Sequence, residues 1–272
     1  MVNRKHEVWI MTILKQEIKS QKLAILIWSF SIGLVIAMCV FMYPSMKSEM
    51  DDVNEIFSSM GSFTSAFGMD KLNFGTLIGF YAVEGGNTLA IGGAFFAAIT
   101  AVTSLLKEEK DRTAEFLLTH PVSRTKIVTE KLMSVFTIII ILNAIVFACS
   151  AISVVIIGES INWKLVLLFH LAYLLMQFEI AGICFGISAF LSKSGIGIGI
   201  GIAAMMYFLN IVANISEDAK VLKYFTPFGY TEGSDIINDK TLKIEYLIPS
   251  MIIMVIGIVV AYVKYNKKDI NA

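Results

Sequence analysis

The sequence predicts an all-α membrane protein with six transmembrane helices, and three observations support this prediction. Of the 272 residues, 56% are hydrophobic and only 16% are charged, whereas a soluble domain carries about 25% charged residues. The apolar residues gather into runs of about 20, the length that a helix needs to cross a bilayer. These runs are continuously apolar, whereas the strands of a membrane barrel would alternate over about ten residues.

Each predicted span is a stretch with no charge, or with a single one. The spans cover residues 23–43, 85–106, 132–157, 165–191, 194–215 and 246–263. Glu179 interrupts the fourth span, and Ser192 and Lys193 alone separate it from the fifth. In the sixth span Pro249 lies in the first turn, where proline is tolerated. The spans form one transmembrane domain over residues 23–265.

The segment before the first span, residues 1–22, has an amphipathic stretch at residues 8–19. Val8, Trp9, Met11, Ile13, Leu14 and Ile18 fall along one helical side, and Lys15, Gln16 and Lys19 fall on the rest. We predict an interfacial (elbow) helix that lies along the inner leaflet. The alternative is a helical extension of the first span, and both arrangements place the segment at the membrane surface.

The orientation follows from the distribution of Lys and Arg between the loops. An even number of spans puts both termini on one side. Residues 1–22, 107–131, 192–193 and 264–272 carry 15 of the 22 basic residues, and the longer opposite segments carry seven. Since cytoplasmic loops are enriched in Lys and Arg, we predict that both termini are cytoplasmic, including the tail at residues 266–272.

Residue content disfavours several functional classes. The chain has 22 basic residues (Lys and Arg) and 22 acidic residues (Asp and Glu). This balance argues against a nucleic-acid-binding protein, because such proteins carry a basic excess. The three histidines have no metal-ligand spacing, and Cys39, Cys149 and Cys184 lie singly in apolar runs. No GxxxxGK[ST] motif occurs, so the chain has no ATP site, and we expect no catalytic residues and no bound metal or cofactor.

Glu179 is the only charge within a predicted span, near the middle of its helix. A carboxylate at that depth costs at least about 2.5 kcal/mol unless it is paired or protonated. We therefore take Glu179 as a candidate residue of a substrate path, with Gln177, Asn143 and Asn210 as candidate partners. The alternative is that Glu179 is protonated or hydrogen-bonded to a neighbouring helix and serves packing.

An aromatic stretch, LKYFTPFGY, occupies residues 222–230 between the last two spans. Aromatic residues concentrate at membrane interfaces, so we predict that this stretch lies at the outer interface or dips into it. Phe225, Phe228 and Tyr230 are candidate residues of a lid or exit gate. An interfacial anchor is the alternative.

The connector between the second and third spans combines charge with an exposed apolar patch. Charges crowd residues 108–115, Phe116, Leu117 and Leu118 follow, and Pro121 ends the helix before Ser123 caps the next one. Three large apolar residues on a short cytoplasmic connector favour docking against another protein.

This connector resembles the coupling region of the ABC-2 type exporter permeases, in which E–x–x–R–T–x–E–x–L–L–x–x–P–V–S–R recurs. The matching residues are Glu109, Arg112, Thr113, Glu115, Leu117, Leu118, Pro121, Val122, Ser123 and Arg124. The SAFLSKS stretch at residues 188–194 and the TPFGY stretch around Pro227 agree with the same family. Glu179 departs from the general pattern.

The resemblance implies half of a transporter in a bacterial plasma membrane. Two permease copies, a homodimer, would pair with two cytoplasmic ABC ATPase subunits that carry ATP and Mg²⁺. A coupling helix over about residues 113–120, including Phe116, would dock on each ATPase. The implied cargo is hydrophobic or amphipathic, and the absence of a large external domain favours a peptide or antibiotic over a glycan.

Two alternatives come from other classes of protein. The first is an ion-coupled secondary transporter, or a component of Na⁺ efflux, centred on Glu179. The spans show no convincing internal repeat of the kind common in such carriers. The second is a membrane enzyme, which would need a pair of catalytic groups at depth. His170 lies nine residues from Glu179 on the same helix, about 13 Å of helical rise and too far for direct contact.

Overall fold

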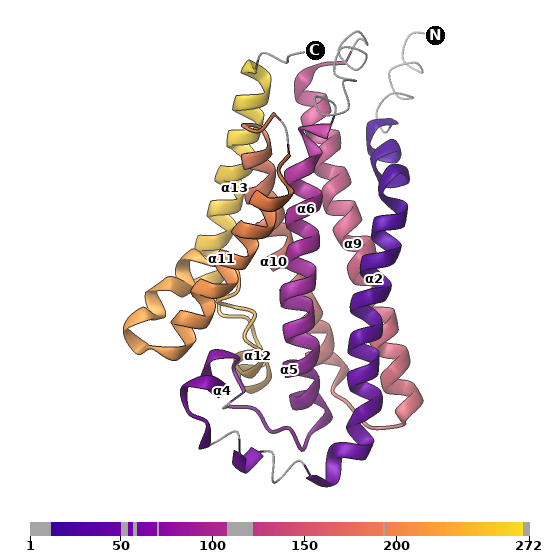
Figure 1. Cartoon of the computed structure of the whole chain (residues 1–272), viewed down its shortest axis with the longest axis vertical. Helices are drawn as coiled ribbons and strands as arrows, with labels where there is room; N and C mark the ends of the chain where they lie inside the picture. The colour runs from indigo at the N-terminus through magenta and orange to yellow at the C-terminus, as the bar shows by residue number, and fades with distance from the viewer. Residues whose placement is uncertain are drawn as a thin grey trace.

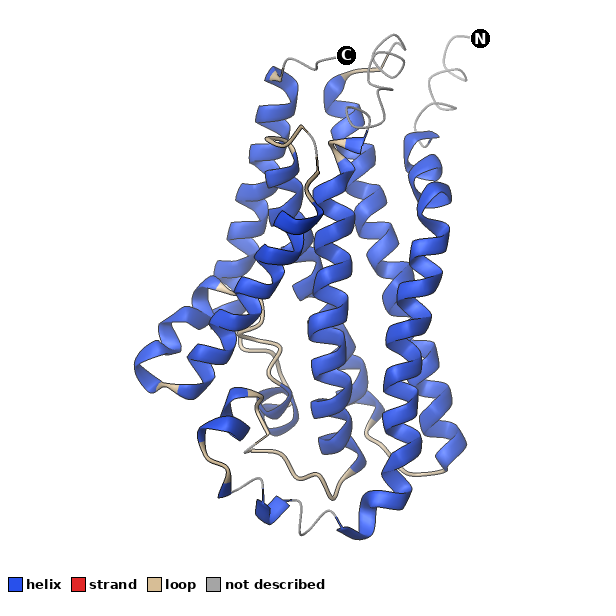
Figure 2. Cartoon of the chain, viewed as in Figure 1, coloured by secondary structure: helices blue, strands red, loops and turns tan. Residues whose placement is uncertain are grey.

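The computed structural model of the chain describes residues 12–49, 54–56, 59–69, 71–107, 122–192 and 194–268. Within these ranges every regular element is a helix and no strand occurs (Figure 2). Six helical stretches are long and apolar enough to cross a membrane. The predicted all-α, six-span membrane fold is therefore confirmed.

Five spans are single helices, and the second is a run of three helical segments. The spans are α2 (Thr12–Met46), the run α5 (Leu77–Thr88), η2 (Leu89–Gly93) and α6 (Ala94–Ser104), then α9 (Arg124–Ile157), α10 (Trp163–Ser188), α11 (Ile196–Ile215) and α13 (Ile244–Lys267). The η2 segment is a π-helical turn. Short helices join the spans: η1 (Lys47–Glu49), α4 (Ser62–Ala66), η3 (Glu217–Phe225) and α12 (Gly233–Asp239).

The two ends of the bundle differ in what they carry. Figure 1 shows α2 beginning and α13 ending at the same end, as an even number of spans requires. We call this the terminal end. The short helices α4 and α12 lie at the opposite end, which we call the loop end.

Several helices extend beyond the uncharged runs in the sequence. The second span begins at Leu77, well before residue 85, and the Thr76 hydroxyl caps it by accepting the Gly79 N–H at 3.2 Å. Glu84 ended the uncharged run but does not interrupt the helix. The third span begins at Arg124, capped as predicted by Ser123, whose Oγ accepts the Lys126 N–H at 3.3 Å.

The described part of the predicted elbow helix is continuous with the first span. Residues 12–22 form the first turns of α2 and do not make a separate helix along the leaflet, which corresponds to the alternative arrangement. No Gly or Pro interrupts this stretch, and Glu17 within it is buried against residues of the second and third spans. Residues 1–11, which hold the rest of the predicted elbow, lie outside the described ranges.

The central helix α10 packs against α6, α9 and α13, and α2 packs along α9. Glycines allow the closest approaches. A Cβ added at Gly186 on α10 would lie 2.5 Å from the carbonyl oxygen of Gly257 on α13, and one at Gly199 on α11 would lie 3.1 Å from the carbonyl oxygen of Ala98 on α6. Such small-residue contacts are the usual way that membrane helices pack closely.

Candidate functional site

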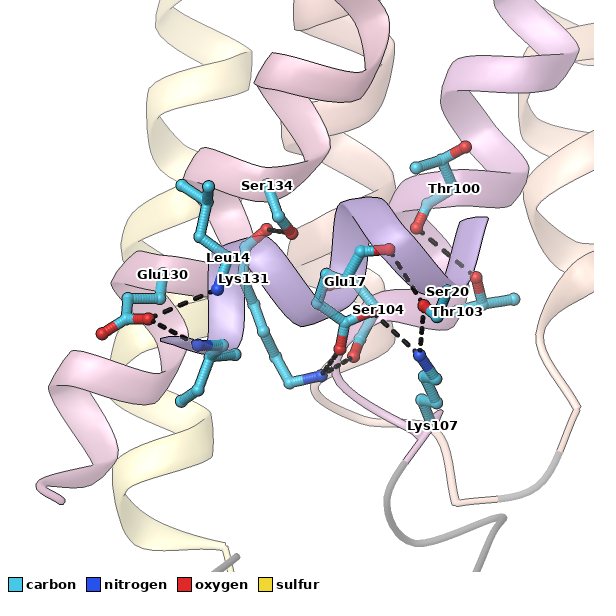
Figure 3. Close-up of polar contacts among 11 residues, drawn as sticks. Leu14, Glu17, Ser20, Thr100, Thr103, Ser104, Lys107, Glu130, Lys131 and Ser134 are labelled. Atoms are coloured by element: carbon cyan, nitrogen blue, oxygen red, sulfur yellow. Dashed lines mark hydrogen bonds and ion pairs between the residues drawn. The ribbon is translucent and has the colours of Figure 1, made fainter. Parts of the chain in front are cut away.

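A cluster of charged residues lies at the terminal end of the bundle. Its members come both before and after the connector at residues 108–121. Lys107 is the last described residue before that connector, and Arg124 begins α9 just after it. We call Glu17, Lys107, Arg124, Glu130 and Lys131 the coupling frame. Figure 3 shows four of them, contributed by α2, α9 and the end of the second span.

Lys131 on α9 is the buried centre of the coupling frame. Its side chain is 0% exposed. Its Nζ donates to Glu17 Oε1 at 3.0 Å and to the Ser104 carbonyl oxygen at 2.7 Å. Glu17 Oε2 accepts from Lys107 Nζ at 3.0 Å, and Lys107 also donates to the Ser20 hydroxyl at 2.9 Å (Figure 3). One carboxylate therefore joins α2, the end of the second span and α9.

Glu130, the neighbour of Lys131, binds the start of α2. Its Oε2 accepts the backbone N–H groups of Ile13 at 3.0 Å and Leu14 at 3.3 Å. N–H groups in the first turn of a helix have no intrahelical acceptor, and a carboxylate there also complements the helix dipole. The first described turn of α2 is thus held against α9 by a second, independent contact.

Arg124 ties the far end of the connector to the end of α13. Its Nη1 donates to the carbonyl oxygens of Tyr265 at 3.4 Å, Asn266 at 3.3 Å and Lys268 at 2.6 Å. The last carbonyls of a helix need such donors. Lys268 Nζ in turn donates to the Leu191 carbonyl oxygen at 2.8 Å, just past α10. Arg124 therefore connects the start of α9 to the end of α13, and Lys268 connects that end to the segment just past α10.

Of the predicted coupling residues and motif matches, Val122, Ser123 and Arg124 lie within the described ranges. The others lie outside them: Glu109, Arg112, Thr113, Glu115, Phe116, Leu117, Leu118 and Pro121. Glu17, Lys107 and Lys131 were not predicted to form a unit. The only available signal was that Lys107 and Lys131 directly border predicted spans, where a charge needs a partner or water.

A second polar site lies around Glu179, which is 0% exposed on α10. Ser250 on α13 donates its hydroxyl to Glu179 Oε2 at 2.6 Å. The Tyr230 hydroxyl is the other polar neighbour, although Oε1 makes no hydrogen bond of good geometry within the described residues. We call Glu179, Tyr230 and Ser250 the buried carboxylate site. Both neighbours are neutral hydroxyl groups, so a charged carboxylate here is costly.

The predicted partners of Glu179 are wrong. Gln177 and Asn143 bind each other, with Asn143 Nδ2 donating to Gln177 Oε1 at 2.7 Å. Two residues along a helix correspond to a rotation of about 200°, so Gln177 and Glu179 face different neighbours. Asn210 is elsewhere, in the lining of a cavity at the loop end.

The aromatic stretch between the last two spans divides into an exposed and a buried part. Phe225 is 60% exposed, whereas Phe228 and Tyr230 are buried at 2% and 1%. An interfacial position therefore fits Phe225 and its neighbour Tyr224, which is 39% exposed, but not Phe228 or Tyr230. The buried part is held by the Thr226 hydroxyl, which donates to the Met206 carbonyl oxygen at 2.9 Å, and by Tyr230 beside Glu179.

Residues 11–270 match the model of the family described as ABC-2 family transporter protein. No curated protein matches the chain.

Proposed function

The chain belongs to the ABC-2 transporter family, so it is a transmembrane component of an ABC transporter, and from this we propose that it is the permease subunit of an exporter. Two copies would form the export path for a hydrophobic or amphipathic substrate, of which a peptide or an antibiotic fits best. A separate cytoplasmic ABC ATPase, present in two copies, would supply ATP hydrolysis with Mg²⁺. The family match over nearly the whole chain is the observation that carries this proposal.

The coupling frame supports a mechanism by which this chain would receive force. The connector at residues 108–121 would dock on the ATPase. Its near end is held to α2 and α9 through Lys107 and Glu17, and its far end to α13 through Arg124. A displacement of the connector would then move several spans together, because each link is a short charged hydrogen bond.

The proposed orientation places the terminal end in the cytoplasm, as the Lys and Arg distribution favours. It can be tested with single cysteines in a cysteine-free background. Lys15→Cys on α2 and Lys164→Cys near the start of α10 are both at exposed positions, at opposite ends of the bundle. In intact cells a membrane-impermeant thiol reagent should label only Lys164→Cys. Labelling of Lys15→Cys alone would show that the orientation is the opposite of the proposed one.

The central experiment is co-purification of the tagged permease from its own membranes in mild detergent. We expect a stoichiometric soluble ATPase, and ATP turnover only in fractions that contain it. Arg124→Gln should weaken substrate export while Lys22→Gln, an exposed charge change on α2, should not. A permease that purifies alone, or that hydrolyses ATP without a partner, would contradict the proposed function.

The buried carboxylate site favours a second candidate, ion-coupled transport centred on Glu179. A fully buried acid with two hydroxyl neighbours is the kind of group that exchanges a proton or binds a cation during transport. Glu179→Gln keeps the shape and the acceptor for Ser250 but cannot ionise. If export continues with an inactive ATPase and stops in Glu179→Gln, the ion-coupled function is correct. If export requires ATP and Glu179→Gln is active, Glu179 serves packing.

A further inference from the structure

Two adjoining hollows at the loop end lie apart from the coupling frame and the buried carboxylate site. The inner one, which we call the inner cavity, has a volume of ≈ 40 Å³. The outer one, the outer cleft, has a volume of ≈ 210 Å³. Gly68, Asn214 and Glu232 line both of them. The two hollows therefore lie side by side, with these residues between them.

The inner cavity presents hydrogen-bond acceptors that lack donors. Asn210 lines it and is 8% exposed, and its Oδ1 has no hydrogen-bond partner within the described residues. The Asn87 Oδ1 accepts from the Tyr207 hydroxyl at 3.3 Å and retains a second lone pair. Glu232 adds a carboxylate, and the rings of Tyr173 and Tyr207 form part of the wall. These groups suit a small cation that carries N–H donors.

Glu232 is held in place between the two hollows. Its Oε2 accepts from Asn214 Nδ2 at 2.9 Å. Gly68 has a φ of +66°, and a Cβ at this position would overlap Glu232 Oε1, so only glycine leaves room for the carboxylate. Burial raises the pKa of the Glu232 carboxyl, and a bound cation beside it would favour the charged form.

The outer cleft balances basic and acidic groups. It is lined by Lys71, Lys220, Lys223, Glu217, Glu232 and Asp235, so its formal charge is zero. Glu217 is paired with Lys220, and Asp235 is paired with Lys243 at 2.6 Å. The Ser234 hydroxyl, 1% exposed, has no hydrogen-bond partner within the described residues. Glu232 also lines the inner cavity, and without it the outer cleft has a formal charge of +1. The outer cleft therefore suits an anionic group and the inner cavity a cationic one, which together favour a zwitterion.

The 3₁₀ helix η3 forms one wall of the outer cleft and carries basic and apolar side chains in separate rows. With three residues per turn, Lys220 and Lys223 fall in one row and Val221 and Tyr224 in another. The lysines line the cleft, whereas Val221 and Tyr224 are 56% and 39% exposed. A short helix with one basic and one apolar side, directly after the end of a span, is typical of a membrane interface.

We propose that these two hollows bind the phosphoethanolamine headgroup of a phospholipid, with the ammonium group in the inner cavity and the phosphate against Lys71, Lys220 and Lys223. The ammonium would donate to Asn210 Oδ1 and to Glu232. A trimethylammonium group has no N–H donors and could not bind these acceptors by hydrogen bonds. The site therefore selects phosphatidylethanolamine over phosphatidylcholine. The assignment of this lipid to the outer leaflet rests on the proposed orientation. The choice of headgroup does not depend on that orientation.

The test is a titration of the purified full-length protein in detergent with short-chain lipids, followed by its thermal unfolding midpoint. We expect short-chain phosphatidylethanolamine to raise the midpoint with an apparent affinity at least about tenfold better than phosphatidylcholine or phosphatidylglycerol. Glu232→Gln and Lys223→Gln should each weaken this affinity at least about tenfold, the effect of losing one charged hydrogen bond. Lys164→Gln, an exposed lysine at the same end outside both hollows, is the matched control and should bind as the native chain does.

Free phosphoethanolamine and simple salts distinguish binding of the lipid from binding of its headgroup or of ions alone. Free phosphoethanolamine should bind, but more weakly than the lipid, because it lacks acyl chains that would contact the apolar side of η3. Equal responses to the three lipids, or responses unchanged in both Glu232→Gln and Lys223→Gln, would overturn the proposal. So would stabilisation by ammonium chloride or sodium chloride as strong as that by phosphatidylethanolamine. If Glu232→Gln does not fold, Lys223→Gln against Lys164→Gln decides alone.

Discussion

Replacing Lys131 by methionine removes the charge at the centre of the coupling frame and keeps most of the side-chain volume. Lys131 is 0% exposed and makes two short hydrogen bonds, to Glu17 Oε1 at 3.0 Å and to the Ser104 carbonyl oxygen at 2.7 Å. Lys131→Met leaves both acceptors without this donor. Glu17 itself is 4% exposed, so its carboxylate cannot recover full hydration.

The expected loss of stability is at the lower end of the range for broken buried ion pairs. Removing one partner of such a pair costs about 3–5 kcal/mol. Glu17 keeps its bond to Lys107 at 3.0 Å, and that lysine is 36% exposed, so part of the charge remains compensated. We therefore expect Lys131→Met to lower the free energy of unfolding by about 3 kcal/mol, or the unfolding midpoint by roughly 6–12 °C for a chain of this size.

Thermal unfolding in detergent at a fixed scan rate measures this loss, and a double-mutant cycle identifies its cause. Glu17→Gln alone should also destabilise the protein. The double variant Glu17→Gln with Lys131→Met should lose less than the sum of the two by about 1–3 kcal/mol, because no charge is then left buried without a partner. Lys15→Met, at an exposed position on α2, the helix that carries Glu17, is the control. A midpoint for Lys131→Met equal to that of Lys15→Met would refute the reasoning, as would strict additivity in the cycle.

Three further predictions follow from the same structure. Arg124→Gln removes three hydrogen bonds to the end of α13 and should cost about 1–2 kcal/mol in chemical denaturation; an unchanged midpoint would mean that this end of the connector is not fixed. Gly186→Ala should cost about 1–3 kcal/mol because its Cβ would lie 2.5 Å from the carbonyl oxygen of Gly257, whereas Gly197→Ala, with nothing within 4 Å, should be neutral or stabilising; equal midpoints would contradict the close packing of α10 and α13. Burial raises the pKa of the Glu232 carboxyl above 4.5, so the folded state binds the carboxyl proton more tightly than the unfolded state does. The stability that this bound proton contributes is therefore lost as pH rises from 4.5 through the raised pKa. The difference in midpoint between the native chain and Glu232→Gln should change over that range, and a constant difference would contradict it.

The spans could be predicted because their cause is local in the sequence. In a bilayer each backbone N–H and C=O must be satisfied within its own segment, so an apolar run of sufficient length becomes a helix. The predicted boundaries were less accurate because a charged residue was taken as the end of a span. Glu84 ended one predicted span, yet the helix continues through it from Leu77. A helix needs hydrocarbon only over part of its length.

The site residues were predicted less well, because their partners are far away in the chain. Glu17 and Lys131 are 114 residues apart and meet only when α2 packs along α9. Glu179 was noted as the one acidic residue within a predicted span, and it is buried, but its partner Ser250 is an ordinary serine in the last span. No local pattern distinguishes that serine from others. The rotation of α10 and α13 about their axes decides the pairing.

The sequence by itself determined the class of protein, the number of spans and, through the motif in the connector, the resemblance to the ABC-2 family. Each of these depends on composition or on residues adjacent in the chain. Only the tertiary structure decided that residues 12–22 extend the first span, that Gln177 faces Asn143 and not Glu179, and that Phe228 and Tyr230 are buried. These outcomes depend on which faces of the helices meet. Within a bilayer that choice comes from close packing at small residues and from pairing of the few polar groups, and both are properties of the assembled bundle.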